Sequence, residues 1–290
     1  MQPGAIAERL WPGRVAAVEP LGGGITNRNF KVRLAEGEDV VLRIGGKDTE
    51  LLGIDRGAEH AASLTAARLG IAPDVVGFVE PEGYLVTRFV PGEPVPAERL
   101  RGRLPEVAEL LRRFHGGPPI PSRFDSFRVV EAYASTAAAH GVAAPPAYER
   151  AKRTADAIES RRGSPAPRPC HNDLLNANFI DERGRIWLVD WEYAGMGDVF
   201  FDLANFSVNH ELDDDENRAL LAAYFGEARE TDLAALRMMR FMSDFREAMW
   251  GVVQQAISDL DVDFVAYAHE HFARLERTAG DVSFREALAA

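Results

Sequence analysis

The residues best suited to chemistry lie in two short segments near the middle of the 290-residue chain. The first segment carries His171, Asp173 and Asn178, and the second delivers Asp190 at the end of a short apolar run. This spacing is typical of sites that transfer a phosphoryl group to a hydroxyl, where one carboxylate accepts the hydroxyl proton while an amide and a second carboxylate hold magnesium on the phosphates of ATP. We therefore predict Asp173 as the catalytic base and Asn178 and Asp190 as magnesium ligands.

A simpler interpretation is that these polar residues only form turns. Asn and Asp favour turns because their side chains hydrogen-bond the local backbone. That interpretation needs a separate reason for each of His171, Asp173, Asn178 and Asp190. A metal and base site explains all of them together, and we adopt it.

Composition limits the other classes of function. The net charge of -12 disfavours a nucleic-acid partner, since phosphate backbones are bound by clustered Lys and Arg. The single cysteine, Cys170, excludes an internal disulfide framework and fits a reducing cytoplasm. The N-terminal segment has Glu8 and Arg9 where a signal peptide is apolar, and no apolar run approaches the roughly 20 residues that span a bilayer. We expect a cytoplasmic protein without membrane insertion; the oligomeric state stays open.

Strand patterns dominate the first 90 residues. Alternating apolar residues between turn residues predict strands at 15–20, 30–34, 40–44, 75–78 and 84–90, and a helix at 58–69 that ends before Gly70. These elements form a small antiparallel sheet with one helix. The glycine triplet at 22–24 lies between the first two strands, where its backbone amides can approach phosphates, although a flexible hairpin turn is the default for such a triplet alone.

Helix patterns dominate the remainder. The cluster of Pro and Gly at 91–96 marks a boundary or hinge. Beyond it we predict helices at 97–115, 126–140, 146–162, 199–225, 231–258 and 261–278, with two short strands around a turn at 181–184. The expected fold is α+β and bilobal, with a nucleotide-binding N-lobe at 1–90 and a mainly helical C-lobe at 91–290 that holds the catalytic loop and the acceptor pocket.

Arg43 on the third strand occupies the place where protein kinases carry a phosphate-binding lysine. Glu59, on the following helix, is the predicted ionic partner of Arg43. The alternative is a solvated strand arginine and an unrelated surface glutamate.

Taken together, these motifs resemble the choline/ethanolamine kinase family, which sits within the aminoglycoside-phosphotransferase-like group. The resemblance runs from about residue 18 to about residue 272. The segments 22–27, 41–44, 171–178 and 190–205 carry it. It implies a bilobal protein-kinase-like fold and ATP-dependent phosphorylation of the hydroxyl of choline, with ethanolamine as a related substrate.

The resemblance also assigns the nucleotide site. An arginine at position 43 is typical of choline kinases, and it implies that Arg43 binds the nucleotide phosphates while Glu59 holds it in place. The segment 87–90 corresponds to the hinge that meets adenine. The residues expected at the nucleotide are Gly22, Gly23, Gly24, Thr26, Asn27, Arg43, Glu59, Thr87 and Phe89.

The acceptor pocket is predicted from the segment 243–251. The family usually carries two tryptophans three positions apart here, but this chain keeps only Trp250 and has Glu247 in place of the first. Glu247, Trp250 and Gln254 share a helix side outside the apolar stripe, and an aromatic with a carboxylate suits a quaternary ammonium. The residues expected to bind the acceptor are Trp191, Glu192, Tyr193, Glu247, Trp250, Gln254 and Tyr267.

The sequence therefore predicts an enzyme that uses ATP and Mg²⁺ to phosphorylate the hydroxyl of a small amino alcohol, with choline as the first candidate. Ethanolamine, thiamine and an aminoglycoside are the alternative acceptors. From a different class, the chain could be an ATP-binding pseudokinase module without turnover. Glu247 at a family aromatic position weakens the choice of choline but not the kinase chemistry.

Overall fold

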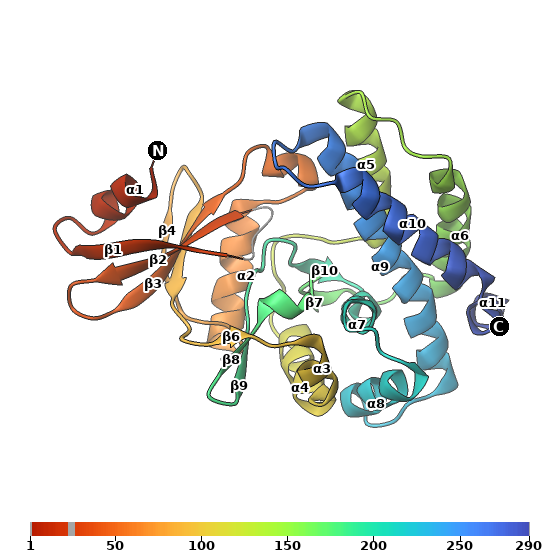
Figure 1. The fold of residues 1–290 in the computed structure, drawn as a ribbon. Helices are drawn as coiled ribbons and strands as arrows, with labels where there is room; N and C mark the ends of the chain where they lie inside the picture. The colour runs from red at the N-terminus through yellow and green to blue at the C-terminus, as the bar shows by residue number, and fades with distance from the viewer. Residues whose placement is uncertain (1, 23–26, 290) are drawn as a thin grey trace.

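The computed structural model describes residues 2–22 and 27–289. Figure 1 shows two lobes, one built on a sheet and the other mainly of helices. The sheet has five antiparallel strands in the order β1-β2-β3-β5-β4. The predicted α+β class and bilobal protein-kinase-like fold are confirmed.

The N-terminal lobe uses every strand that the sequence predicts. The strands are β1 (Val15–Leu21), β2 (Asn27–Leu34), β3 (Asp39–Gly45), β4 (Val75–Val79) and β5 (Tyr84–Arg88). The lobe also contains α1 (Pro3–Leu10), the 3-10 turn η1 (Thr49–Leu52) and α2 (Arg56–Arg68). Helix α1 was not predicted from the sequence.

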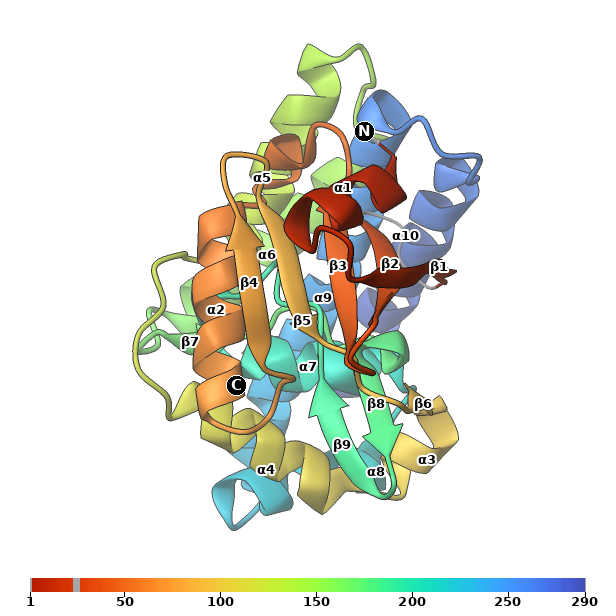
Figure 2. The ribbon, with the colours of Figure 1, turned by 90° about the vertical axis from the view of Figure 1, so that its left-hand side faces the viewer.

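The two-residue period of β3 lets the sheet form a core on one face and a cleft on the other. The buried residues of β3 are Val40, Leu42 and Ile44. They pack with Ile6 of α1, which lies over the outer face of the sheet in Figure 2. Val41 and Arg43 alternate with them and line the cleft on the opposite face. This alternation puts Arg43 between the lobes.

The C-terminal lobe begins with a short strand and continues mainly as helices. Its strands are β6 (Glu93–Pro94), β7 (Arg168–Cys170), β8 (Phe179–Glu182), β9 (Arg185–Leu188) and β10 (Gly195–Gly197), with the 3-10 turn η2 at Asn176–Asn178. Its helices are α3 (Ala97–Arg101), α4 (Leu104–His115), α5 (Ser126–Ala139), α6 (Ala147–Arg162), α7 (Val199–Asn209), α8 (Asp214–Phe225), α9 (Glu230–Ile257), α10 (Phe264–Gly280) and α11 (Val282–Ala289).

Two predicted helices are each divided in the structure, which corrects the sequence analysis. The segment 97–115 forms α3 and α4 because Gly102 ends the first helix and Pro105 lies in the first turn of the second. The segment 199–225 forms α7 and α8 because Asp213 and Glu216 make a capping box that starts a new helix. The other predicted helices agree with α2, α5, α6, α9 and α10 within three residues.

The division of the chain at residue 90 stays a prediction. The five-stranded sheet ends at Arg88, and β6 pairs with β8 of the second lobe, which supports the boundary. However, Ala62 and Ala66 of α2 belong to the same hydrophobic core as the helices of the second lobe. The lobes therefore share a packed interface on the α2 side.

The long helix α9 organises the second lobe and contacts α5, α7 and α10. Most of its length is buried, including the charged residues Asp244, Arg246 and Glu247. Because buried charges need partners, α9 fixes polar groups in the interior as well as apolar ones. Across residues 2–22 and 27–289, no helix has both the length and the apolar composition needed to cross a membrane.

His210, which follows α7, gives a testable pH dependence of stability. Its Nδ1 lies 2.8 Å from the carbonyl oxygen of Phe206, and burial lowers its pKa to about 4. The unfolded chain, with a pKa near 6.5 for this group, binds the proton first as pH falls. Stability is therefore lost between pH 6.5 and 4, by on the order of 3 kcal/mol in total.

Urea unfolding of the wild type and of His210→Gln across this pH range checks the prediction. His140→Gln is the matched control, because His140 also lies at a helix end with Nδ1 near the carbonyl oxygen four residues earlier, but it is exposed. We expect a shallower slope of unfolding free energy against pH for His210→Gln only. Equal slopes in all three proteins would contradict the assignment.

Candidate active site

The loop that carries Asp173 is held by a buried carboxylate on α7. Asp202 accepts hydrogen bonds from the backbone N–H groups of His171 and Asn172, each at 2.7 Å, and it lies 2.9 Å from Nε2 of His115. The backbone at Asn172 is left-handed, with φ of 67°, a conformation in which Asn is enriched. Asp202 thus fixes the loop just before Asp173.

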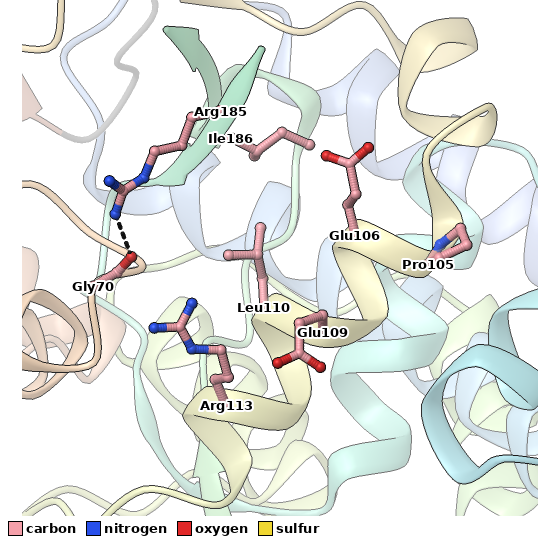
Figure 3. A pocket seen from close by; sticks show the side chains of 8 residues that line it. All are labelled: Gly70, Pro105, Glu106, Glu109, Leu110, Arg113, Arg185 and Ile186. Carbon is pink, nitrogen blue, oxygen red and sulfur yellow. Dashed lines mark hydrogen bonds between the residues drawn. The ribbon is translucent and has the colours of Figure 1, made fainter.

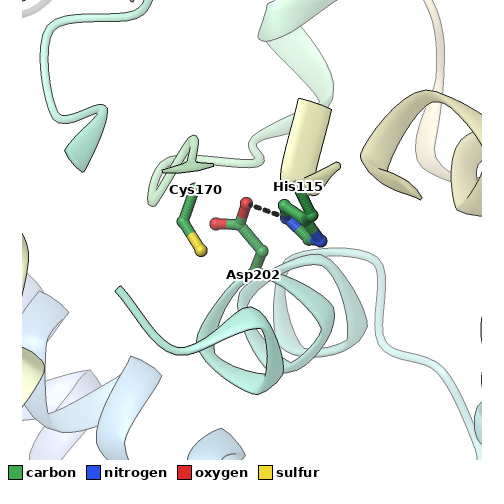
Figure 4. A group of neighbouring side chains, drawn as sticks. All are labelled: His115, Cys170 and Asp202. Carbon is green, nitrogen blue, oxygen red and sulfur yellow. Dashed lines mark hydrogen bonds and ion pairs between the residues drawn. The ribbon is translucent and has the colours of Figure 1, made fainter. Parts of the chain in front are cut away.

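His115, Cys170 and Asp202 lie together, as Figure 4 shows, and by residue type they resemble a metal site. Their donors are already used: both oxygens of Asp202 accept N–H groups, and Nδ1 of His115 lies 2.6 Å from the hydroxyl of Tyr224. Burial also raises the pKa of the Cys170 thiol, which disfavours the thiolate that a metal requires. The group therefore supports the catalytic loop.

His171 joins the two segments that carry the predicted chemistry. Its Nε2 donates to the carbonyl oxygen of Val189 at 3.0 Å, and its Nδ1 accepts from the backbone N–H of Asp173 at 3.2 Å. Burial lowers the pKa of His171, so the neutral ring is favoured. Both nitrogens are engaged, which fits a positioning role rather than proton transfer.

Asp173 and Asn178 are in direct contact. Nδ2 of Asn178 donates to the carbonyl oxygen of Asp173 at 2.8 Å and to its carboxylate at 3.3 Å. Burial raises the pKa of Asp173 to about 7, although the guanidinium of Arg246, 3.4 Å from the carboxylate, acts to lower it. A carboxyl group with this pKa is matched to proton acceptance near neutral pH.

A cleft of about 580 Å³ lies between the sheet and the catalytic loop. Among the predicted nucleotide-site residues, Gly22, Arg43, Thr87 and Phe89 line it, as do both predicted metal ligands. The N–H of Phe89 donates to the carbonyl oxygen of Asp39, so this amide is not free for a ligand. Gly23, Gly24 and Thr26 lie outside the residues that the structure describes.

Arg43 connects the sheet to α2 and to the catalytic segment. Its Nη1 lies 2.6 Å from Oε1 of Glu59 and 2.8 Å from Oδ1 of Asp190. Burial alone would lower the pKa of Arg43, but the charges of Asp190 and Glu59 outweigh it and raise the pKa. The predicted contact between Arg43 and Glu59 is present, and the structure adds Asp190 to it.

Arg56 is the hub of a second set of contacts around the same cleft, which the sequence analysis did not identify. Its Nη1 lies 2.7 Å from Glu59 and 3.1 Å from Glu192, and its Nη2 lies 3.0 Å from both Asn27 and Thr49. Asn27 in turn donates to Glu192 at 2.9 Å. The end of the glycine turn is thereby tied to the catalytic segment.

Glu192 faces this network and not the predicted acceptor pocket. Burial raises its pKa to about 8, with a further contribution from the charge of Asp190 and opposition from Arg43 and Arg56. Trp191 packs against Phe114 and His171 and lines the cleft between the lobes. The structure does not bring these two residues into one group with the other predicted acceptor residues.

Four of the predicted acceptor residues do lie together. Nε1 of Trp250 donates to the hydroxyl of Tyr193 at 3.1 Å, and the Tyr267 hydroxyl donates to Glu247 at 2.8 Å. The rings of Trp250 and Tyr267 are 5.5 Å apart. Gln254 is buried one turn beyond Trp250 on α9.

Arg246 completes this group, and the sequence analysis missed it. It is bonded to Glu247, and its guanidinium carbon lies 4.3 Å from the centre of the Tyr193 ring. The face of Tyr193 therefore already carries a cation from the protein. Burial opposes ionisation of Glu247, but the charge of Arg246 outweighs it and lowers the pKa of Glu247.

A second cavity, of about 450 Å³, lies near the end of α2 and away from the predicted site residues (Figure 3). Arg185 donates to the carbonyl oxygen of Gly70 at 2.8 Å, and Arg113 donates to that of Leu69. These two arginines satisfy carbonyl groups just after the helix, where no intrahelical partner exists. The cavity is thus bordered by groups that already have a structural role.

The chain is similar to known proteins in sequence and fold. The model of the phosphotransferase enzyme family matches residues 17–239. Probable choline kinase 3 of Arabidopsis thaliana is 24% identical over 88% of this chain and 84% of its own. Ethanolamine kinase 1 of Mus musculus is 25% identical over 90% of this chain and 84% of its own. A solved choline/ethanolamine kinase family protein from Mesorhizobium loti is 32% identical, with a TM-score of 0.84 over 99% of this chain and 97% of its own.

The hub role of Arg56 predicts a large loss of stability on its removal. Arg56→Met leaves Glu59 and Glu192 without one cation and should lower the unfolding free energy by about 3–5 kcal/mol. Arg14→Met is the matched control, since Arg14 pairs with Glu36 on the exposed surface and its loss should change the unfolding free energy little. Urea unfolding of both variants measures the difference, and similar losses would contradict the buried hub.

Proposed function

Because this chain belongs to the phosphotransferase enzyme family, and within it to the choline/ethanolamine kinase family, we propose that it transfers the γ-phosphate of ATP to the hydroxyl of a small amino alcohol. One observation carries the proposal. Arg43, Asn178 and Asp190 line one cleft, and Asp173 contacts Asn178 at its edge. Phosphoryl transfer depends mainly on positioning and charge stabilisation, and these are the groups that it needs.

The nucleotide occupies the cleft between the lobes in this proposal. Val41 of the sheet and Ile180 and Val189 of the other lobe offer apolar surfaces for the base. Thr87 and Phe89 border it on the hinge side, and Arg43 lies at the end where the phosphates would be. A volume of about 580 Å³ is in the range of small-molecule sites.

Asn178 and Asp190 would hold Mg²⁺, which prefers oxygen ligands. Asn178 uses its Nδ2 inside the protein, so its carbonyl oxygen can serve as a ligand. Asp190 contacts Arg43 through Oδ1, so Oδ2 is the second candidate ligand. When bound, the metal neutralises charge on the β- and γ-phosphates.

Asp173 is the proposed base. The acceptor hydroxyl oxygen bonds to the γ-phosphorus, the bond from this phosphorus to the bridging oxygen of ADP breaks, and the hydroxyl proton passes to the Asp173 carboxylate. Choline is the first acceptor that we propose, and ethanolamine is the second. Trp250 and Tyr267 support a cationic acceptor, because aromatic faces attract ammonium groups.

A substrate panel tests this function. ADP release should be measured with choline, ethanolamine, thiamine and an aminoglycoside, and we expect turnover with choline or ethanolamine. Asp173→Asn should lower kcat by about 10²–10⁴-fold while ATP binding persists, since a general base is lost. Asp244→Asn is the control for a buried aspartate, because Asp244 pairs with Arg274 and His271 of α10. No ADP release with any acceptor would favour a nucleotide-binding module without turnover.

The acceptor assignment of Trp250 gives a further prediction. Trp250→Leu should raise the KM for choline by about tenfold to thirtyfold, since a desolvated cation–π contact contributes about 2 kcal/mol, and should leave the KM for ATP nearly unchanged. Trp187→Leu is the matched control, because Trp187 is also buried and its Nε1 also has a partner, Glu182 at 2.8 Å. Equal increases in both KM values for Trp250→Leu would show that Trp250 is ordinary core.

A further inference from the structure

Arg246 stands beside the proposed catalytic base and is only 2% exposed. Its Nη1 faces two carboxylates: it is bonded to Glu247 and lies 3.4 Å from Oδ1 of Asp173. One side of its guanidinium group packs on the ring of Tyr193. Among the described residues these contacts account for one nitrogen and one face of the group.

The other nitrogens of Arg246, Nε and Nη2, are buried and have no hydrogen-bond partner in the part of the chain that the structure describes. Buried polar groups in native proteins are almost always paired, so each exception needs an explanation. Nε and Nη2 form one edge of the planar guanidinium group. This edge matches the two oxygens of a carboxylate, which it can bind with two parallel hydrogen bonds.

We propose that Arg246 forms an anion subsite in the acceptor pocket, which binds a carboxylate carried by the acceptor. The inference rests on the proposed function. The acceptor still carries a hydroxyl and an ammonium group, and it carries an anionic group as well. The substrate class that fits is a hydroxy amino acid, whose hydroxyl meets Asp173 and whose carboxylate meets the free edge of Arg246. Choline and ethanolamine would use only the remainder of the pocket.

Glu247 complements this subsite. Its Oε1 is bonded to Arg246, and its Oε2 accepts from Tyr267 at 2.8 Å. A carboxylate and a guanidinium group side by side offer opposite charges to the two ends of a zwitterion. Tyr267 is the least buried member of the group that includes Tyr193, Glu247 and Trp250, so it is the side chain whose movement would admit a ligand.

Matched acceptors test the proposal. L-serine differs from ethanolamine by one carboxylate, and L-serine methyl ester keeps the bulk without the charge. With the wild-type enzyme and ATP, kcat/KM for L-serine should exceed that for ethanolamine and for the ester by about tenfold to a hundredfold, the range expected of a charge-assisted hydrogen bond. The kcat/KM for N,N,N-trimethyl-L-serine should likewise exceed that for choline, which lacks the carboxylate.

Arg246→Met should remove the preference for acceptors with a carboxylate. Arg246→Lys keeps the charge but not the two parallel N–H donors, and it should retain part of the preference. The readout is the ratio of kcat/KM for serine to that for ethanolamine. A purely structural role of Arg246 at Asp173 would lower both values and leave the ratio unchanged. A wild-type ratio near one, or an unchanged ratio in Arg246→Met, overturns the proposal.

The outcomes also separate this inference from the proposed function. Turnover of choline or ethanolamine without a carboxylate preference refutes the anion subsite alone. Absence of turnover with every acceptor refutes the kinase function, and calorimetric titration of serine and ethanolamine into the wild-type protein then decides the subsite by itself. The same titration replaces kinetics if Arg246→Met does not fold, with serine and its methyl ester as the pair compared.

Discussion

The active site depends on a cluster of buried charges where the two lobes meet. Three carboxylates, from Glu59, Asp190 and Glu192, share two guanidinium groups, from Arg43 and Arg56. Charges are costly to bury unless they are paired, so the sheet, α2 and the catalytic segment must keep their relative positions for the cluster to persist. The cluster has one more carboxylate than cations, and burial, together with the charge of Asp190, raises the pKa of Glu192 to about 8.

Each side of the cluster is fixed by different physical means. On the sheet, the side chains of β3 alternate between the two faces. Leu42 is therefore buried on the side of α1, and Arg43 faces the cleft. On the other side, Asp202 holds the catalytic loop by hydrogen bonds to backbone amides, and the side chains of His171 and Asn178 bond the backbone within it. Apolar packing thus positions the charged groups on the sheet, and backbone hydrogen bonding positions those beside the catalytic loop.

Site residues that lie close together along the chain could be predicted from the sequence. Those whose contacts lie far away along the chain could not. Asp173 and Asn178 lie on one loop, and Arg43 lies on a short strand with alternating apolar residues. Motif spacing and the two-residue period of the strand were therefore enough to predict that these residues lie near one cleft. Arg56 contacts Glu192 and Arg246 contacts Asp173 across long separations, and neither contact has a periodic signal. The break before α8 is different, because the pair Asp213 and Glu216 is a local capping signal and is present in the sequence itself.

The proposed acceptor site is centred on α9, whose interior charges are buried. Glu247, buried on this helix, requires a cation, and Arg246 supplies it from the adjacent position. Because α9 is buried against α5, α7 and α10, this ion pair also needs partners outside the helix, which Tyr193 and Tyr267 provide. The ion pair therefore joins α9 to α10 and to the segment before β10, whereas Arg43, Asn178 and Asp190 line the cleft between the lobes.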